Sequence, residues 1–257
     1  DKNSFEVSGR GELQLSILIE TMRREGYELS ISQPKILFNI DPKTKKIMEP
    51  IEEVLIDVDS EFSGNIVEKL SNRGGVLKEM FGTNNGKQRL KFLAPSRSLI
   101  GYHGEFLTDT KGTGILTKSF HDFAEKKNNL RLRKNGVIVS TAQGKAVPYA
   151  LWNLEDRGAL IIGPNSEVYS GMIIGEHSKP NDLEANPIKN KQLTNIRASG
   201  KDEAIKLSPI KKFTLEKAIS YINNDELIEV TPKSIRLRKK LLLQHERKRE
   251  LRKKNKQ

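Results

Sequence analysis

The stretch of residues 54–70, VLIDVDSEFSGNIVEKL, predicts a β-strand that runs almost directly into an α-helix. Residues 54–58 alternate between two faces, as in a strand with one buried side. Ser63 can cap a helix with apolar residues along one side, and the glycine pair at 74–75 can end that helix. This pattern indicates the first βα half of a small α/β domain.

The next residues predict the second half of the same domain. Residues 76–93 indicate two strands joined by a tight turn, because Asn85-Gly86 is a strong hairpin signal. A second helix is expected after Ser96, which can cap it, and a last strand is expected at 115–120. The resulting order β-α-β-β-α-β predicts a ferredoxin-like domain over 47–127.

Residues before this domain indicate an incomplete unit. Residues 5–8 alternate like a strand, residues 15–22 have the spacing of a helix with one buried stripe, and residues 27–31 alternate again. One strand, one helix and one strand cannot bury a core alone. We therefore expect residues 1–36 to be the second half of another α/β domain.

Residues after the ferredoxin-like domain predict a compact, mostly antiparallel β domain over 128–257. Short apolar runs between 137 and 174, including a predicted strand at 146–151, are separated by turn clusters. Residues 176–199 indicate a long loop. The predicted fold class is α+β: a partial and a complete ferredoxin-like domain, followed by a β domain with a basic C-terminal helix.

Two helices are predicted near the C-terminus. Thr214 can cap a short helix with one apolar face. Thr231-Pro232 has the features of the start of the second helix, with threonine as its cap and proline in its first position. The final helix is therefore expected to begin at 231 and to carry the basic tail 232–257.

The composition excludes several classes of protein. The 257 residues contain no cysteine, which excludes disulfides and thiolate metal sites, and the four histidines are scattered. The mean hydropathy is −0.57, and the longest apolar runs are far shorter than a membrane span needs. The chain begins at Asp1 without a methionine or a signal sequence, so we expect a cytoplasmic protein whose sequence here begins mid-protein.

The charge is concentrated at one end of the chain. The net charge is +12. Residues 232–257 contain 12 basic and two acidic residues, a net charge of +10, which leaves +2 for the other 231 residues. The sequence therefore describes a nearly neutral body with a basic tail.

The sequence contains no convincing active site. Residues 112–119, GTGILTKS, resemble a phosphate-binding loop but have threonine where its second glycine is required. There is no Gly-x-Ser-x-Gly motif, and His121 beside Asp122 is better explained as surface than as a general base. We predict no catalytic residue, no metal site and no cofactor in this chain.

Two segments instead favour nucleic-acid binding. The loop 189–201 combines cations, which neutralise phosphates, with small polar side chains that can bond sugars and base edges. The predicted final helix carries many cations whose mutual repulsion a polyanion would relieve. The predicted RNA contacts are Lys189, Lys191, Thr194, Asn195, Arg197, Ser199, Gly200 and Lys201 in the loop, and Arg236, Arg238, Lys239 and Lys240 in the tail.

Each segment also has a simpler explanation. The loop could be an ordinary solvated surface loop. The basic tail could bind an anionic membrane, although such helices usually carry a face with tryptophan or phenylalanine, which is missing here.

Several stretches resemble a known family. Residues 9–26, GRGELQLSILIETMRREG, resemble the third domain of translational GTPases such as EF-G. Only 14 residues separate Pro34 from Glu49, which leaves no room for the fourth domain of EF-G. Residues 193–200, LTNIRASG, and 225–232, DELIEVTP, resemble the C-terminal domain of the BipA/TypA group.

The resemblance implies a function. It implies the ribosome-binding C-terminal portion of a GTPase that acts in large-subunit assembly and stress adaptation. The GTPase domain, with GTP and Mg²⁺, would lie upstream of Asp1, so this chain alone would be catalytically inert. The loop carrying Lys191 and Arg197 would contact ribosomal RNA and the acceptor arm of a tRNA in the A site. The resemblance implies a cytoplasmic monomer that does not bind membranes.

A second hypothesis comes from a different class of function. The chain could be a regulatory scaffold that binds a protein or nucleotide effector, with the basic tail as a non-specific anchor. Ribosome association that survives removal of residues 244–257 would favour this hypothesis.

Overall fold

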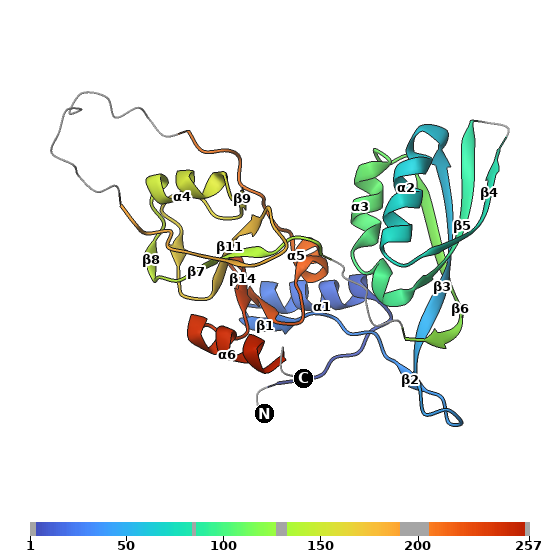
Figure 1. Cartoon of the computed structure of the whole chain (residues 1–257), viewed down its shortest axis with the longest axis horizontal. Helices are drawn as coiled ribbons and strands as arrows, with labels where there is room; N and C mark the ends of the chain where they lie inside the picture. The colour runs from blue at the N-terminus through green and yellow to red at the C-terminus, as the bar shows by residue number, and fades with distance from the viewer. Residues whose placement is uncertain (1–3, 84–85, 127–132, 191–205, 255–257) are drawn as a thin grey trace. The chain divides into compact units, whose positions relative to one another are not determined.

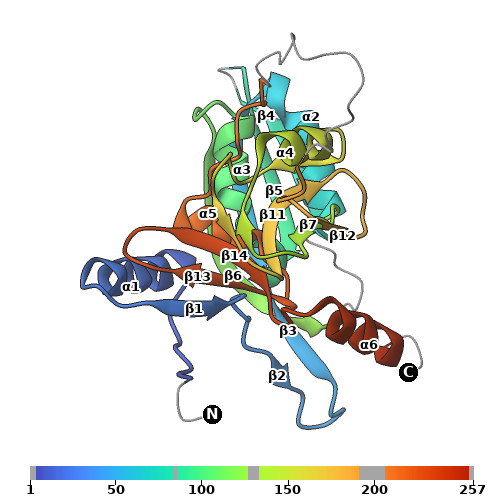
Figure 2. The ribbon, with the colours of Figure 1, turned by 90° about the vertical axis from the view of Figure 1, so that its left-hand side faces the viewer.

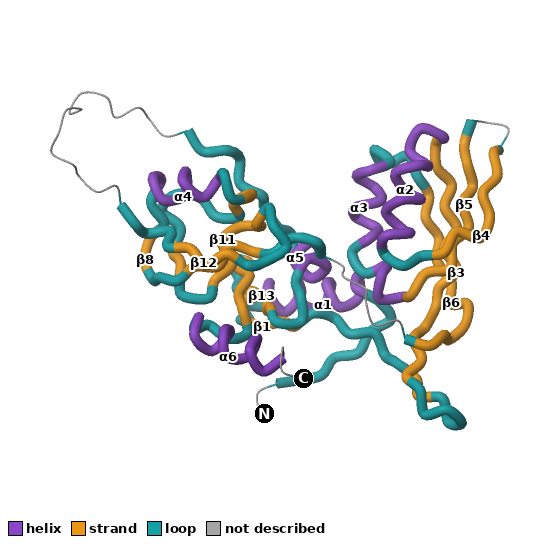
Figure 3. The backbone as a smooth tube through the Cα atoms, viewed as in Figure 1, coloured by secondary structure: helices purple, strands orange, loops and turns teal. Residues whose placement is uncertain are grey.

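The computed structural model describes residues 4–83, 86–126, 133–190 and 206–254 (Figure 1). The chain divides into two compact units, one of Asp1–Gln33 with Arg133–Gln257 and the other of Pro34–Leu132. Helices and mostly antiparallel strands occur in both units, which confirms the predicted α+β class (Figure 3). We call them unit 1 and unit 2.

Unit 2 has the predicted ferredoxin-like order. Its elements are β2 (Asn39–Ile40), β3 (Ile47–Asp59), α2 (Ser60–Asn72), β4 (Val76–Gly82), β5 (Lys87–Pro95), the 3-10 helix η1 (Ser96–Leu99), α3 (Tyr102–Asp109) and β6 (Ile115–Glu125). The four long strands lie in the order β6-β3-β5-β4, and neighbouring strands are antiparallel. The short strand β2 pairs with the start of β3.

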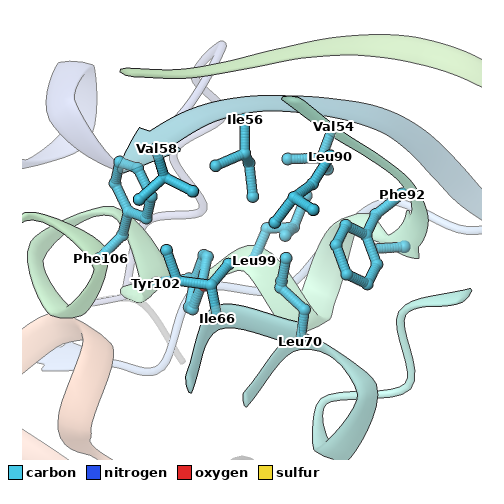
Figure 4. Packing of buried hydrophobic residues seen from close by; sticks show 11 residues of the cluster. Val54, Ile56, Val58, Ile66, Leu70, Leu90, Phe92, Leu99, Tyr102 and Phe106 are labelled. Carbon is cyan, nitrogen blue, oxygen red and sulfur yellow. The ribbon is translucent and has the colours of Figure 1, made fainter. Parts of the chain in front are cut away.

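The core of unit 2 lies between its sheet and its two helices. Alternate residues of β3 and β5 point toward α2 and α3, as Figure 4 shows for Val54, Ile56 and Phe92. Ile66 from α2 and Phe106 from α3 meet them and are fully buried. The opposite face of the sheet carries neither helix (Figure 1).

The predicted helix caps in unit 2 are wrong in detail. α2 begins at Ser60 after Asp59, and Ser63 lies inside the helix, where its hydroxyl donates to the Ser60 carbonyl at 2.8 Å. Ser96 starts only a 3-10 turn, because Gly101 interrupts the segment with a φ of 70°. A positive φ of this kind favours glycine and ends the turn before α3 begins.

Unit 1 is a seven-stranded sheet with helices on both faces. Its elements are α1 (Glu12–Arg24), β1 (Leu29–Ser32), β7 (Val137–Ser140), β8 (Gly144–Lys145), α4 (Pro148–Glu155), β9 (Gly158–Leu160), β10 (Glu167–Val168), β11 (Met172–His177), β12 (Leu183–Ala185), α5 (Leu215–Tyr221), β13 (Glu226–Val230), β14 (Ile235–Lys239) and α6 (Gln244–Lys254). The sheet order is β1-β13-β14-β11-β7-β12, with β9 also paired to β11, and β8 and β10 form a separate pair.

Each face of this sheet has its own core. Residues of α1 and α5, including Ile19 and Ile219, pack with Ile228 and Leu237 on one face. Leu151 of α4 packs with other strand residues on the second face. Thr214 caps α5 as predicted, since its hydroxyl accepts from the Lys217 amide at 3.3 Å.

The N-terminal segment contributes a strand to the sheet of unit 1. β1 pairs with β13 in antiparallel register, and the Arg23 guanidinium donates to the Thr231 carbonyl at 2.9 Å. Residues 5–8, predicted as a strand, form none and are exposed, because no neighbouring strand in the described chain pairs with them. The predicted domain boundaries, 1–36, 47–127 and 128–257, stay predictions.

The strand predicted at 146–151 is wrong, because most of these residues belong to α4. Pro148 occupies the start of the helix, where its fixed φ suits the first turn and its missing amide hydrogen costs nothing. Leu151 and Leu154 are three residues apart and both contact the core of one sheet face. That spacing fits a helix.

The predicted start of the final helix at 231 is also wrong. Residues 231–234 form the turn of a hairpin, in which the Ser234 amide donates to the Thr231 hydroxyl at 3.0 Å, and β14 follows. Ile235 and Leu237 face a core, and Arg236 lies between them. Threonine followed by proline suits a β-turn as well as a helix start, and the alternation after it belongs to a strand. The helix begins at Gln244.

A buried ionic cluster ties the end of β14 to its neighbours. The Lys239 ammonium lies 2.6 Å from Asp182, 2.7 Å from Asp225 and 2.9 Å from Glu226, and its side chain is 3% exposed. Arg133 pairs with the fully buried Glu226 at 2.7 Å. Burial alone would lower the pKa of Lys239, but the three carboxylates outweigh burial and raise that pKa. The cluster therefore joins four segments of unit 1 through charge.

We expect Gly158→Ala to destabilise unit 1. A Cβ at this position would lie 1.9 Å from the Glu176 carbonyl oxygen, where β9 pairs with β11. Relieving such a clash costs about 1–3 kcal/mol. Urea unfolding should show a lower midpoint for this variant than for Gly163→Ala, whose Cβ would meet nothing within 4 Å. Equal midpoints would contradict the close approach of β9 and β11.

We expect Lys239→Met to cost about 3 kcal/mol of unfolding free energy, because it removes the cation from a buried cluster of carboxylates. The neighbouring Lys240 is exposed. Lys240→Met is therefore the matched control and should change stability by less than about 0.5 kcal/mol. Chemical denaturation of both variants measures the difference. A Lys239 variant as stable as the control would show that the cluster does not hold the strands together.

Candidate nucleic-acid interface

Most of the predicted loop contacts fall outside the described residues. The positions in this group are Lys191, Thr194, Asn195, Arg197, Ser199, Gly200 and Lys201. Lys189 is described, and its side chain is exposed. The structure therefore describes only Lys189 of this predicted group, and the chain on either side of residues 191–205.

The chain before the loop is held against unit 1. The Val147 amide donates to the Pro187 carbonyl at 3.0 Å, and the Asn186 side chain accepts from the Ile188 amide at 3.0 Å. Ile188 packs on the same core as α4. These contacts fix the approach to residue 190 beside the start of α4.

The chain after the loop returns to the same end of unit 1. Leu207 packs on the core under α4, and the Ser208 amide donates to Glu155 in the last turn of α4 at 2.5 Å. The Lys211 amide donates to the Leu160 carbonyl at 2.8 Å. The described ends of the chain on both sides of the loop therefore lie near α4 (Figure 1).

The four predicted tail contacts lie on β14 and just after it, so their placement on a helix is wrong. Lys239 is buried in the ionic cluster, and its ammonium faces carboxylates. Arg238 pairs with Glu229 at 2.7 Å. Arg236 is half-buried and Lys240 is exposed. Of the four, Lys240 has the most accessible side chain.

The partner of Arg238 belongs to a further hydrogen-bonded group. The Tyr169 hydroxyl donates to Glu229 at 2.6 Å. Burial raises the pKa of Tyr169, and the hydrogen bond to Glu229 raises it further. Arg238 thus balances a carboxylate within the protein, which leaves less of its charge for an outside phosphate.

A second group of basic residues lies on α6, later in the sequence than the predicted tail contacts at 236–240. Lys248, Arg249, Arg252 and Lys253 are exposed on this helix. Their spacing of three and four residues is visible in the sequence, but the error in the helix start concealed which cations share its face. The residues predicted for the tail therefore lie on β14 and just after it instead of on α6, and their contact with RNA stays a prediction.

The open sheet face of unit 2 does not suit base stacking. RNA-binding domains with this strand order stack bases on aromatic residues of their central strands. The outward positions of β3 and β5 instead carry ion pairs, Arg89 with Asp57 at 2.5 Å and Lys91 with Glu53 at 3.0 Å. The hydrogen bond from Arg89 lowers the pKa of Asp57. This face therefore does not provide a typical RNA platform.

A metal site and a membrane-spanning helix are both missing from the described part of the chain. Among residues with defined positions, no group of three or more histidine, aspartate or glutamate side chains is placed to hold a metal ion. In the same residues, no helix is both long and apolar enough to cross a membrane.

Comparison with known proteins identifies two domains. Residues 46–133 match the family model described as the elongation factor G C-terminus. Residues 135–244 match the TypA/BipA C-terminal domain. The first match falls mostly on unit 2, and the second on the part of unit 1 that follows it in the sequence.

Curated relatives match over nearly the whole chain. The large ribosomal subunit assembly factor BipA of Haemophilus influenzae is 53% identical over 249 residues, which is 96% of this chain and 40% of that protein. The protein of the same name from Escherichia coli K12 is 49% identical over 251 residues, which is 97% of this chain and 41% of that protein. The chain thus spans about two fifths of the length of these relatives, and it belongs to the BipA/TypA family, of which it carries the EF-G-type and TypA/BipA C-terminal domains.

Proposed function

We propose that this chain is the ribosome-binding portion of a large-subunit assembly factor. The observation that carries the proposal is the identity of 49–53% over at least 96% of the chain to proteins named as such factors. The parent protein would be a GTPase that acts in stress adaptation. Its GTP and Mg²⁺ would bind a domain outside this sequence, so this chain alone would be catalytically inert.

The proposed partners are ribosomal RNA of the large subunit and the acceptor arm of a tRNA in the A site. The residues on either side of the loop support a role in this contact, because they are hydrogen-bonded to unit 1 near α4. Sites supported by rigid elements are positioned more precisely than sites on unsupported loops. We propose that the chain acts as a monomer in the cytoplasm.

The cations of unit 1 differ in how far they are buried against carboxylates, and this difference also supports the proposal. Lys239, Arg133 and Arg238 satisfy carboxylates within unit 1. Exposed cations occur on α6 and at Lys189. The second group remains positioned for contact with a polyanion, which releases counterions when it binds.

We expect this chain to bind isolated large ribosomal subunits with a strong dependence on salt. If about six phosphates are contacted, the logarithm of the affinity should fall with the logarithm of salt concentration with a slope of roughly −4 to −5. Sedimentation of the chain with large subunits over a range of salt concentrations measures the slope. An affinity that does not change with salt concentration, or no binding at all, would contradict the proposal.

We expect Lys191→Ala with Arg197→Ala to weaken binding to large subunits more than Lys233→Ala with Lys240→Ala. Both double variants remove two positive charges, but only the first pair lies in the loop expected to make shaped contacts. Competition against the unsubstituted chain measures the difference. Equal losses would mean that the loop acts only through net charge. Association that survives both changes and the removal of residues 244–257 would favour the scaffold hypothesis.

A further inference from the structure

Helix α6 is fixed to unit 1 by Arg247. The Arg247 guanidinium contacts Glu184 of β12 at 2.7 Å and donates to the carbonyls of Leu241 at 2.6 Å and Leu242 at 2.7 Å. Its side chain is 12% exposed. One side chain therefore joins the first turns of α6 to a strand of the sheet and to the chain segment that precedes the helix.

A second, independent contact fixes the segment before α6. A Cβ on Gly171 would lie 2.7 Å from the Leu242 Cα atom, and the φ of Gly171 is 88°. The Ser170 hydroxyl also donates to the Leu242 carbonyl at 3.3 Å. Only glycine permits this close approach without strain. The position of α6 therefore follows from packing as well as from charge.

Five residues of α6 lie on the side of the helix away from this anchor. With 3.6 residues per turn, His245, Lys248, Arg249, Arg252 and Lys253 lie within an arc of about 140°. Arg247 lies on the opposite side of the helix, and Glu246 and Glu250 lie outside the arc. The same five exposed residues border one open hollow of about 440 Å³ on the helix surface, so their side chains are neighbours there. We call this surface the basic face of α6.

The composition of the basic face favours a phosphate backbone as its ligand. It has no carboxylate, and its four exposed lysines and arginines are the side chains that contact phosphates. It lacks asparagine, glutamine, phenylalanine, tyrosine and tryptophan, which read or stack bases, and its one aromatic ring is the imidazole of His245. Leu251 is the one apolar residue of α6, so the helix has too little apolar area to bury in a membrane.

We propose that α6 is a docked RNA-binding helix that grips the phosphate backbone through its basic face, without reading sequence. Arg247 is a positioning residue that turns this face outward and does not itself touch RNA. The inference rests on the proposed function, because it takes RNA as the partner of the chain. It goes further by assigning the contact to named residues and by separating the anchor from the ligands.

The first test neutralises two cations of the basic face. In Arg249→Gln with Arg252→Gln, loss of two phosphate contacts should lower affinity for a labelled RNA hairpin about 25- to 60-fold at about 0.1 M salt and make the salt slope shallower by about 1.4 to 1.8. The matched control is Lys212→Gln with Lys217→Gln, which removes the same charge from exposed positions at and near α5. The control should keep the slope of the unsubstituted chain.

The second test removes the anchor. Arg247→Met keeps an unbranched side chain but loses every hydrogen bond to Glu184 and to the carbonyls. We expect faster hydrogen exchange at amides 244–254 and severalfold weaker RNA binding. The salt slope should stay near that of the unsubstituted chain, because the four exposed cations remain. A role in stability alone would leave RNA affinity unchanged and would overturn the assignment of Arg247.

The outcomes separate this inference from the proposed function. Binding of RNA and large subunits that is unaffected by Arg249→Gln with Arg252→Gln overturns the inference and leaves the proposed function standing. Equal losses in this variant and its control also overturn it, since net charge alone would then explain binding. Loss of binding to an acidic polyglutamate peptide, with RNA binding intact, would assign the face to a protein partner. An unsubstituted chain that binds neither RNA nor large subunits would overturn both.

Discussion

The buried pairing of Lys239 and Arg133 with Glu226 is the constraint on which the rest of unit 1 depends. Glu226 is fully buried, so its charge must be matched inside the protein. Lys239 reaches Asp182, next to β12, and Asp225, next to β13, from the end of β14. The same cations therefore hold together the strands from which the loop and α6 depart. The described ends of the loop 189–201 and helix α6 are therefore positioned by Lys239 and Arg133, whose charges are already neutralised by carboxylates and cannot bind a ligand.

This constraint changes the meaning of a net charge of +12. Ten of these charges fall in residues 232–257, which makes the tail look like one uniform basic region. The structure divides the tail at about residue 240. Before this point, Lys239 and Arg238 neutralise buried or partly buried carboxylates. After it, α6 carries exposed cations on one face and Arg247 on the other. Cations that stabilise the fold, before residue 240, are therefore followed closely in the sequence by cations that are exposed for binding, on α6.

The fold was predictable where periodicity and turn signals agreed. The ferredoxin-like order of unit 2 follows from alternating strands, a helix with one apolar face and a hairpin signal. Prediction failed where one local signal suits two structures. Thr231-Pro232 suits a helix start or a turn, and only pairing with β13 selects the strand β14. At Pro148 the apolar run suited a strand, but packing against the sheet selects a helix. Such choices are made by contacts between distant residues, which one sequence does not display.

The candidate site also depends on contacts between distant residues that one sequence does not display. Sequence identified the basic tail, but no local pattern marks Lys239 as buried, because its three carboxylates lie 13 to 57 residues away. Nor does it show that α4 and α6 lie apart in unit 1, with α4 above α6 in both views (Figures 1 and 2). An RNA that meets both the described ends of the loop beside α4 and the basic face of α6 must therefore span the distance between these two helices. Two weak contacts on one rigid body raise each other's effective concentration only when a single ligand can reach both. A large folded RNA meets that condition, whereas a short flexible strand would gain little from the second contact.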